Sequence, residues 1–487
     1  MNNLYRWVIN LMTGVLFAIM IRQGNYGGFP SEKRPASETK YGTVIYPGTL
    51  IILFLMELLI SCLGNSCFSF DIMFSNICMC SISVVVFYAL FLSFLPLLRK
   101  YISVKTIAIL WILPNYLYFA RYSVMALDKP VLSFSVGTAS LQKVSLIWFT
   151  VASIVFAAYV IRHLLFRYKL LRGAKPVSDE LVCLLWEKMQ TEYEIKKTGI
   201  KMVTSDQTPT PLSIGVFWRT TVLVLPDTDY TEDELKLIFR HELIHIIRRD
   251  SQYKLYIAFC NAICWFNPFM WAAMKKSTED LELSCDEYVV EDCSKEEKAL
   301  YGKLILSTAG NDAGFSSCLS AGAGALKYRL DSIYKPKRKY SGGVIAGVIL
   351  ATMLLTTGCI AISYSHQTLA DVFDKNVKEL KEIEWVSYGE GNEHGSIYYC
   401  KDQNVLNNYL LNLDICCLTG WYHRSGYNGK SLTCQYKTDE GSVQVNIREH
   451  EIGYTPLYKE GRKERFVYYF DESVDWDYIM SLLTVDP

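Results

Sequence analysis

The sequence predicts an α-helical polytopic membrane protein that contains an embedded α+β domain and a small extracellular α+β domain. Three observations predict this fold class. Six apolar segments approach the length that a bilayer core requires. Hydrophobic residues make up 51% of the chain and the net charge is +0, which argues against direct nucleic-acid binding, since that requires a basic surface. A His-Glu-x-x-His motif lies in the more polar region between the fifth and sixth apolar segments.

The apolar segments divide the chain into four parts. Residues 1–166 are expected to form a transmembrane bundle of about five helices, and residues 341–364 a final transmembrane helix. A membrane-surface domain, 167–340, lies between them, and 365–487 form the last domain. The first segment lacks a small-residue cleavage site, so we expect an anchor rather than a removed signal peptide. The segments are 4–21, 49–63, 77–98, 107–120, 144–161 and 343–363, of which the second and fourth are short.

The distribution of basic residues predicts the orientation. If the motif region is cytoplasmic, the loops 22–48 and 99–106 are also cytoplasmic, and they contain Arg22, Lys33, Arg34, Lys40, Arg99, Lys100 and Lys105. The opposite side of the N-terminal third then receives only Arg6, Arg121, Lys129 and Lys143. Because lysine and arginine collect in cytoplasmic loops, we expect an external N-terminus, a cytoplasmic motif and an extracellular C-terminal domain.

The motif itself is typical of a zinc hydrolase. His241 and His245 are one helical turn apart and can bind one ion, while Glu242 lies beside the open coordination position as general base. Thr231 and Glu234 form a capping box that starts this helix near Thr231. The alternative is a pair of partly exposed histidines that interact with nearby acids.

A second predicted helix, residues 275–291, offers the third ligand. Glu282 and Asp286 share one face of it, so Glu282 can complete a His/His/Glu site for Zn²⁺ while Asp286 orients a ligand histidine. The alternative is an acidic solvated face, because other acids crowd the same region, namely Glu279, Asp280, Glu287, Glu291 and Asp292.

An apolar run between the two motifs, residues 255–274, is about long enough to cross the membrane. A full crossing would put Glu282 on the far side from His241, so we predict a helical hairpin broken near Asn267 and Pro268. The hairpin then dips into the inner leaflet or packs under the spans, and the metal site lies near the cytoplasmic membrane surface.

Shorter elements flank these helices. In the membrane-surface domain we predict a helix at 178–193 and strands at 200–203 and 220–225, and an edge strand beside the metal could pair with an extended peptide. In the last domain we predict helices at 369–383 and 474–483 and strands at 443–447 and 465–470. Its cysteines could form one or two disulfides, namely Cys400, Cys416, Cys417 and Cys434.

Four segments together resemble the BlaR/MecR family of membrane-embedded metallopeptidases, which are bacterial antirepressor sensor-transducers. These segments are 211–226, 238–250, 264–268 and 282–286. The resemblance implies a zinc-metalloprotease (gluzincin-like) domain in a multi-pass protein of the bacterial cell membrane. It further implies that His241, His245 and Glu282 bind zinc, that Glu242 is the base, and that Asp250 and Asp286 support the ligands.

The resemblance also implies a function. Family members cleave a cytoplasmic winged-helix repressor in response to an external signal, and they cleave themselves in the region that here contains Cys318, Leu319, Ser320 and Ala321. No serine of the C-terminal domain has a lysine three residues later, so covalent β-lactam sensing through Ser-x-x-Lys is not expected. Membrane lipid, an unknown extracellular ligand and a second copy of the chain in a homodimer are further candidate partners.

Two other functions stay open at this point. One is a constitutive membrane zinc protease that resembles the CAAX prenyl protease group and serves quality control or peptide maturation. The other is a receptor that keeps the motif without proteolytic turnover. The appended C-terminal domain favours the sensor-transducer over the constitutive protease, and the intact Glu242 disfavours the receptor.

Overall fold

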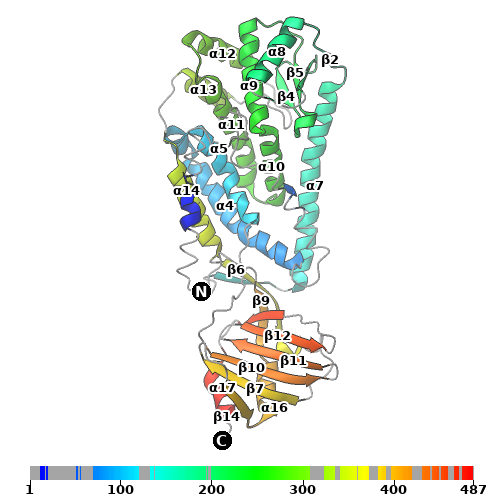
Figure 1. Ribbon diagram of the computed structural model, residues 1–487, viewed down its shortest axis with the longest axis vertical. Helices are drawn as coiled ribbons and strands as arrows, with labels where there is room; N and C mark the ends of the chain where they lie inside the picture. Colours follow the sequence, from blue (N-terminus) through cyan, green and yellow to red (C-terminus); the bar gives the residue numbers. More distant parts are fainter. Residues whose placement is uncertain are drawn as a thin grey trace.

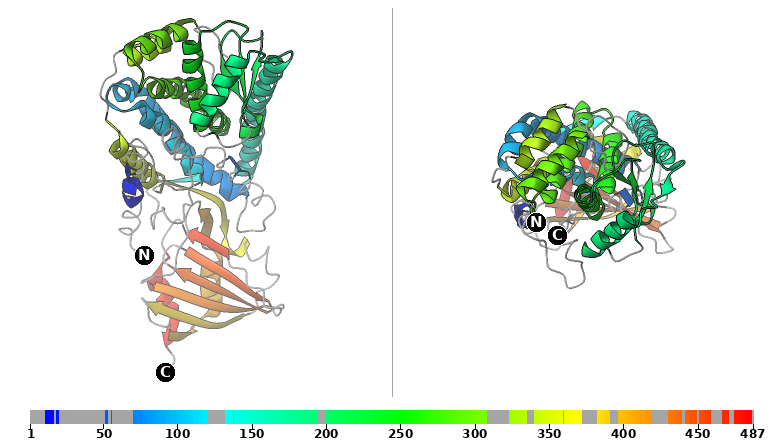
Figure 2. Two further views of the ribbon diagram at one scale, coloured as in Figure 1. Left: turned by 45° about the horizontal axis from the view of Figure 1, so that its top comes forward. Right: turned by 90° about the horizontal axis from the view of Figure 1, so that it is seen from above.

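The computed structural model describes most of the chain. The described residues are 11–16, 18–19, 51–52, 55, 70–119, 132–136, 138–193, 195, 199–307, 323–334, 340–358, 360–371, 382–390, 396–418, 430–438, 441–448, 451–458, 466–470 and 474–485. Three layers follow one another along the long axis of the molecule (Figure 1). The helices around the His-Glu-x-x-His motif form one end, apolar helices form the middle, and a β-sheet forms the other end. The left view of Figure 2 shows the same separation.

Two helices among the described residues are long and apolar enough to cross a membrane, judged by length and composition. They are α4 (Phe70–Tyr101) and α7 (Thr138–Leu171), which contain the predicted segments 77–98 and 144–161. On α7, Leu146, Ile154 and Leu165 expose 68%, 63% and 62% of their surface. Since such contiguous apolar exposure is rare on soluble proteins, it favours a lipid environment for α7.

Two predicted spans have different bounds. Segment 107–120 is divided between α5 (Val104–Ile112) and the 3-10 helix η1 (Leu113–Phe119). The change coincides with Pro114, which has no N–H for an α-helical hydrogen bond. Segment 343–363 begins as α14 (Gly343–Gly358) but continues as strand β6 (Ile360–Thr368), which pairs with β1 (Leu132–Val136) and β9 (Asp414–Leu418). Segments 4–21 and 49–63 lie mostly outside the described residues, and their described parts are helical.

The apolar run after the motif breaks where the sequence predicts. Helix α10 (Asp250–Ile263) ends at Ile263, and the next helix, α11 (Pro268–Val289), begins at Pro268. The Asn267 side chain accepts a hydrogen bond from the Phe269 N–H, and Pro268 occupies the first helical position, where its missing N–H costs nothing. The chain reverses direction between α10 and α11, and this reversal brings Glu282 of α11 back next to His241 of α9.

The remaining elements of this half surround helix α9 (Glu232–Arg248). The capping box of Thr231 and Glu234 is present as predicted. Helix α8 (Glu180–Glu192) packs on α9, where Trp186 contacts the fully buried Phe239. A four-stranded sheet lies beside α9 in the order β2-β3-β5-β4. Its strands are Lys175–Pro176, Lys201–Thr204, Val222–Leu225 and Leu212–Ile214, and helices α12 (Lys295–Ser307) and α13 (Ala323–Tyr334) follow α11.

The C-terminal domain contributes most strands of a second sheet, whose order is β1-β6-β9-β13-β12-β11-β10-β7-β8-β14. The predicted strands at 443–447 and 465–470 correspond to β11 (Gly441–Arg448) and β13 (Phe466–Phe470), and the predicted last helix to α17 (Trp476–Leu482). Of the helix predicted at 369–383, residues 369–371 are helical and 372–381 lie outside the described residues. Its predicted end is wrong, because β7 (Glu382–Glu390) begins there and pairs with β10. The other strands are β8 (Ser396–Cys400), β10 (Lys430–Thr438), β12 (Glu451–Tyr458) and β14 (Leu483–Val485), and α16 spans Gln403–Leu411.

The predicted disulfides of this domain do not form among the cysteines whose side chains the structure describes. Cys400, Cys416 and Cys434 are free thiols, and the side chain of Cys417 lies outside the described residues. Cys434 is fully buried in the core of the sheet, and burial raises its pKa to about 12. It therefore behaves as a small apolar side chain.

One buried carboxylate fixes α11 against the apolar helices. Asp280 accepts hydrogen bonds from Arg99 Nε of α4 at 2.8 Å and from Trp111 Nε1 of α5 at 2.7 Å. Its side chain is 0% exposed. Because Asp280 is two residues before Glu282, this contact determines where the second half of α11 lies.

Replacement of Asp280 by alanine should therefore destabilise the fold strongly. It would leave the Arg99 and Trp111 donors without this acceptor in a buried site, at a cost of roughly 3 kcal/mol. Asp233→Ala is the matched control, because its ion pair with Lys236 is on the surface and the Asp233 side chain is 75% exposed, so its removal should cost at most about 0.5 kcal/mol. Chemical unfolding of the full chain in detergent micelles measures both, and equal losses would contradict this role of Asp280.

Candidate metal centre

Helix α9 brings the two histidines of the motif together in the interior. His241 Nε2 and His245 Nε2 are 3.0 Å apart, and both residues are 2% exposed. This is the result of the i, i+4 spacing, which places successive side chains on one helix face. Glu242 is buried as well and lies on the adjoining face.

Helix α11 directs Glu282 at this pair, as the sequence predicts. Glu282 Oε2 lies 3.4 Å from His245 Nε2 and 3.7 Å from His241 Nε2. Its other oxygen, Oε1, is 3.3 Å from the buried Lys254 Nζ of α10. Oε2 makes no hydrogen bond with the described residues although it is buried.

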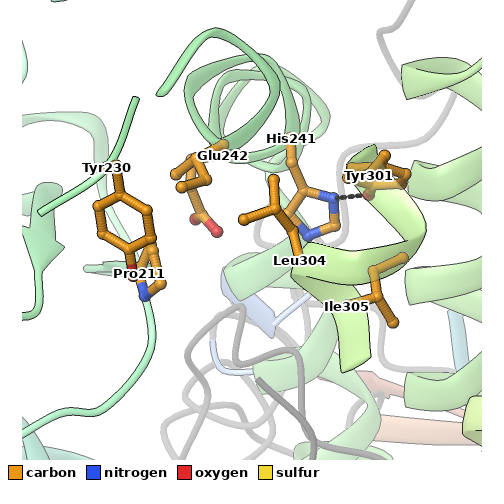
Figure 3. Close-up of a pocket in the computed structure, with 8 residues that line it drawn as sticks. Pro211, Tyr230, His241, Glu242, Tyr301, Leu304 and Ile305 are labelled. Atoms are coloured by element: carbon orange, nitrogen blue, oxygen red, sulfur yellow. Dashed lines mark hydrogen bonds between the residues drawn. The ribbon is translucent and has the colours of Figure 1, made fainter. Parts of the chain in front are cut away.

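The outer nitrogen of each imidazole has its own partner. His245 Nδ1 is 2.5 Å from Asp250 Oδ2, and Arg248 holds the other oxygen of Asp250 at 3.1 Å. His241 Nδ1 is 2.7 Å from the Tyr301 hydroxyl of α12, the contact drawn as a dashed line in Figure 3. Asp250 therefore lies where the sequence predicts, beside a histidine of the motif.

Asp286 is predicted to orient a ligand histidine directly, but in the structure the Tyr301 hydroxyl lies between Asp286 and His241. Its Oδ1 is 3.8 Å from His241 Nδ1, and the Tyr301 hydroxyl bridges the two by donating to Asp286 Oδ1 at 2.7 Å. Arg329 of α13 binds the same carboxylate through Nε at 2.6 Å and Nη2 at 2.7 Å. Asp286 can thus orient His241 only through Tyr301.

The ionisation states in this network are well defined. Burial, the largest effect, raises the pKa of the Tyr301 hydroxyl, and the Asp286 charge raises it further, so Tyr301 keeps its proton. Burial lowers the pKa of Arg329, but Asp286 outweighs burial and the guanidinium stays charged. Burial raises the pKa of Glu282, but the charges of His245 and Lys254 outweigh it and hold this pKa well below its usual range. Burial lowers the pKa of each histidine, but Cys285 and Glu282 outweigh it and raise the pKa of His241 to about 9 and that of His245 well above its ordinary value. The imidazoles therefore hold their protons until a metal displaces them.

When a metal displaces the Nε2 protons, these contacts direct three electron pairs at one another. If each Nδ1 donates its proton to Tyr301 or Asp250, each Nε2 carries a lone pair, and the nearest atom to both is the Glu282 carboxylate. Hydrogen positions follow here from the hydrogen-bond partners. Two imidazole nitrogens and a carboxylate oxygen within 3.7 Å of one another are a donor set that suits Zn²⁺. The residues present therefore fit the predicted ion.

A second donor set includes the thiol of Cys285. Atoms of His241, His245 and Cys285 lie within 4.8 Å of one another. However, Cys285 Sγ lies 3.5 Å from His241 Nδ1, the nitrogen that Tyr301 already contacts, and 3.5 Å from the His241 carbonyl oxygen. Glu282 lies on the Nε2 side, where the lone pairs converge, so we favour Glu282 as the third ligand.

A pocket opens next to His241 and Glu242. Both side chains extend from α9 toward it, and Tyr230 lies opposite Glu242 (Figure 3). The rest of the wall is mainly apolar and consists of Pro211, Ile238, Tyr301, Leu304 and Ile305. The arrangement places a carboxylate and an imidazole predicted to bind the metal at the same small cavity, as a hydrolase requires.

Sequence reasoning missed three residues of the site. Lys254 is an isolated cation in an apolar run, and Arg329 lies between Leu326, Leu330 and Ile333 on the apolar side of α13; both positions are signals of a buried charge. Tyr301 has no such signal. The predicted self-cleavage residues Cys318, Leu319, Ser320 and Ala321 lie outside the described residues.

Comparison with known proteins gives the family. The model of the BlaR1 peptidase M56 family matches residues 70–333. The chain is 29% identical over 119 residues, 24% of its length, to the regulatory protein BlaR1 of Bacillus licheniformis. It is 25% identical over 236 residues, 45% of its length, to the methicillin resistance mecR1 protein of Staphylococcus aureus. It spans only 20% and 39% of the lengths of these relatives. Since the family model covers more than half of the chain and the whole metal centre, the chain belongs to the BlaR1 peptidase M56 family.

Proposed function

We propose that this protein is a membrane-embedded zinc endopeptidase of a sensor-transducer system. The observation that carries the proposal is the convergence of His241, His245 and Glu282 beside Glu242 in a buried site with an adjoining pocket. Membership of the BlaR1 peptidase M56 family supports it. The two named relatives are a regulatory and a resistance protein, which supports a role in signal transduction.

The chemistry assigned to the site is amide hydrolysis. When bound, zinc supplies the electrophile that acidifies water and polarises the scissile carbonyl. Glu242 accepts the proton of the attacking water and returns it to the leaving amine. Asp250 and the Tyr301–Asp286 pair hold the two imidazoles with Nε2 toward the ion. Lys254 binds Glu282 Oε1, which leaves Oε2 for the ion.

The small sheet has an edge strand next to the pocket, which favours a peptide as the substrate. Strand β4 is at one edge of the sheet, and Pro211, the residue before it, lines the pocket. An extended peptide that pairs with such an edge would be directed past Glu242 by main-chain hydrogen bonds. The apolar pocket wall would then contact a side chain of the substrate.

The arrangement of the layers supports a transmembrane role. The metal centre and the C-terminal sheet lie at opposite ends of α4 and α7 (Figure 1). We propose that 1–166 and 341–364 cross the membrane of a bacterial cell, that 167–340 are cytoplasmic and that 365–487 sense an extracellular ligand. The proposed substrate is a cytoplasmic winged-helix repressor, with cleavage of the chain itself at 318–321 as a proposal that rests on sequence alone.

The identity of the third ligand can be tested by zinc content. We expect the purified full chain to bind one equivalent of zinc, His241→Ala and Glu282→Gln to lose most of it, and Cys285→Ser to retain it. The reason is that Cys285 faces the wrong nitrogen of His241. Mass spectrometry of the metal in detergent-purified protein measures all four samples. Zinc that survives Glu282→Gln and disappears in Cys285→Ser would contradict the assignment of Glu282.

The role of Glu242 can be tested by separating metal binding from turnover. Glu242→Gln should keep zinc but slow cleavage at least about 100-fold, because it removes the general base. Glu232→Gln is the matched control, since Glu232 is on the same helix and its side chain is 72% exposed. The readout is proteomic comparison of cells that express each variant, in which a DNA-binding protein should accumulate with Glu242→Gln alone. Identical cleavage products in all three strains would exclude this mechanism.

A further inference from the structure

Helix α13 contributes a buried charge to the candidate metal centre, although it lies outside the two motifs that predict the site. Arg329 is 1% exposed, and its guanidinium forms two hydrogen bonds with the fully buried Asp286. A guanidinium and a carboxylate paired in this way have little freedom to rotate. Four helices are thereby connected in series, from Arg329 of α13 through Asp286 of α11 and Tyr301 of α12 to His241 of α9.

The direction of each hydrogen bond in this series is determined by its chemistry. Arg329 has only N–H groups to donate, so both oxygens of Asp286 must accept. Tyr301 has one proton, and its donation to Asp286 Oδ1 leaves only the hydroxyl oxygen for His241. His241 Nδ1 therefore donates to Tyr301, and in the neutral imidazole that binds a metal the lone pair is on Nε2.

Without Arg329, the donor and acceptor roles of Asp286, Tyr301 and His241 would no longer be fixed. Asp286 would lose the two hydrogen bonds that hold its carboxylate in one orientation toward Tyr301. The Tyr301 proton could then turn toward His241 Nδ1, and the tautomer of His241 with hydrogen on Nε2 would become available. That tautomer cannot bind a metal through Nε2.

The position of α13 depends on a second contact next to Arg329. The Tyr328 hydroxyl donates to the Arg99 carbonyl oxygen at 3.1 Å, and the Arg99 guanidinium lies 5.5 Å from the centre of the Tyr328 ring. Arg99 is the residue that pairs with Asp280 at the end of α4. Two adjacent residues of α13 thus bind two different helices, which fixes both its position and its rotation.

The chain continues from α13 toward the C-terminal domain. Ser341, just before α14, accepts a hydrogen bond from Thr106, and Tyr340 pairs with Ile102 at the turn between α4 and α5. Helix α13 therefore lies in sequence between the metal centre and the helix that leads to the C-terminal sheet. A displacement of α13 would move Arg329 directly.

We propose that Arg329 is a positioning residue that fixes the tautomer of His241, so that the metal centre is complete only while α13 is docked. The inference rests on the proposed function, because it concerns the regulation of that same site. Docking of α13 then determines whether the site can hold its metal.

The first experiment measures zinc affinity of the full chain in detergent micelles by competition with a chromogenic chelator. Arg329→Gln should weaken zinc binding about 10- to 100-fold, the usual effect of losing a group that orients a metal ligand. Arg329→Lys, which keeps the charge but not the two-pronged geometry, should fall between that variant and the parent. Lys327→Gln is the matched control, an equal change at an exposed position of the same helix, and should bind zinc as the parent does.

The second experiment separates positioning from general destabilisation by a double-mutant cycle. In a Tyr301→Phe background the relay is already broken, so Arg329→Gln should weaken zinc binding less than about 3-fold further. A purely structural role would give the same loss in both backgrounds. If Arg329→Gln does not fold, Arg329→Lys and the doubly neutral Asp286→Asn/Arg329→Gln replace it, because neither leaves an unpaired buried charge.

The outcomes distinguish this inference from the proposed function. If the parent chain binds no zinc, the proposed function fails. If the parent binds zinc and Arg329→Gln and Arg329→Lys bind it equally well, the role of Arg329 is overturned while the zinc site stands. An equal loss with and without the Tyr301 hydroxyl also overturns it.

Discussion

The mutual approach of three electron-pair donors is the constraint on which the site depends. Two imidazole Nε2 atoms 3.0 Å apart and a carboxylate oxygen within 3.7 Å repel one another unless protons or a metal cation lie among them. The surrounding hydrogen bonds hold these three donor atoms close together. Asp250 and Tyr301 direct the imidazoles from behind, and Lys254 occupies the outer oxygen of Glu282. Zn²⁺ bound by these three donors would stabilise the arrangement.

The rest of the fold brings these donors together from separate helices. The hairpin of α10 and α11 reverses at Asn267 and Pro268, which returns Glu282 to the side of α9. Asp280 then fixes α11 to the apolar helices through Arg99 and Trp111. The metal centre is therefore connected to the membrane layer by hydrogen bonds as well as by the chain. Within this architecture, a change in the apolar helices has a short physical route to the site through Arg99, Tyr328 and α13.

The predictable part of the site is the part that one helix or one local motif defines. The spacing of His241, Glu242 and His245, the capping box at Thr231 and the break at Pro268 are local properties, and the structure agrees with each. Tyr301 and Arg329 come from helices whose docking is a long-range result, so their roles could not be derived from spacing. For the same reason the sequence missed that Asp286 contacts His241 through Tyr301, and that α14 is followed by a strand, β6, that pairs with distant β1 and β9.

Zinc K-edge X-ray absorption of the purified full chain in detergent micelles tests the central claim most directly. The claim is that His241, His245 and Glu282 hold the ion and Cys285 does not. The spectrum should show only nitrogen and oxygen neighbours at about 2.0–2.2 Å, including the multiple scattering of two imidazoles. A sulfur neighbour at about 2.3 Å would contradict the account, since it would make Cys285 a ligand.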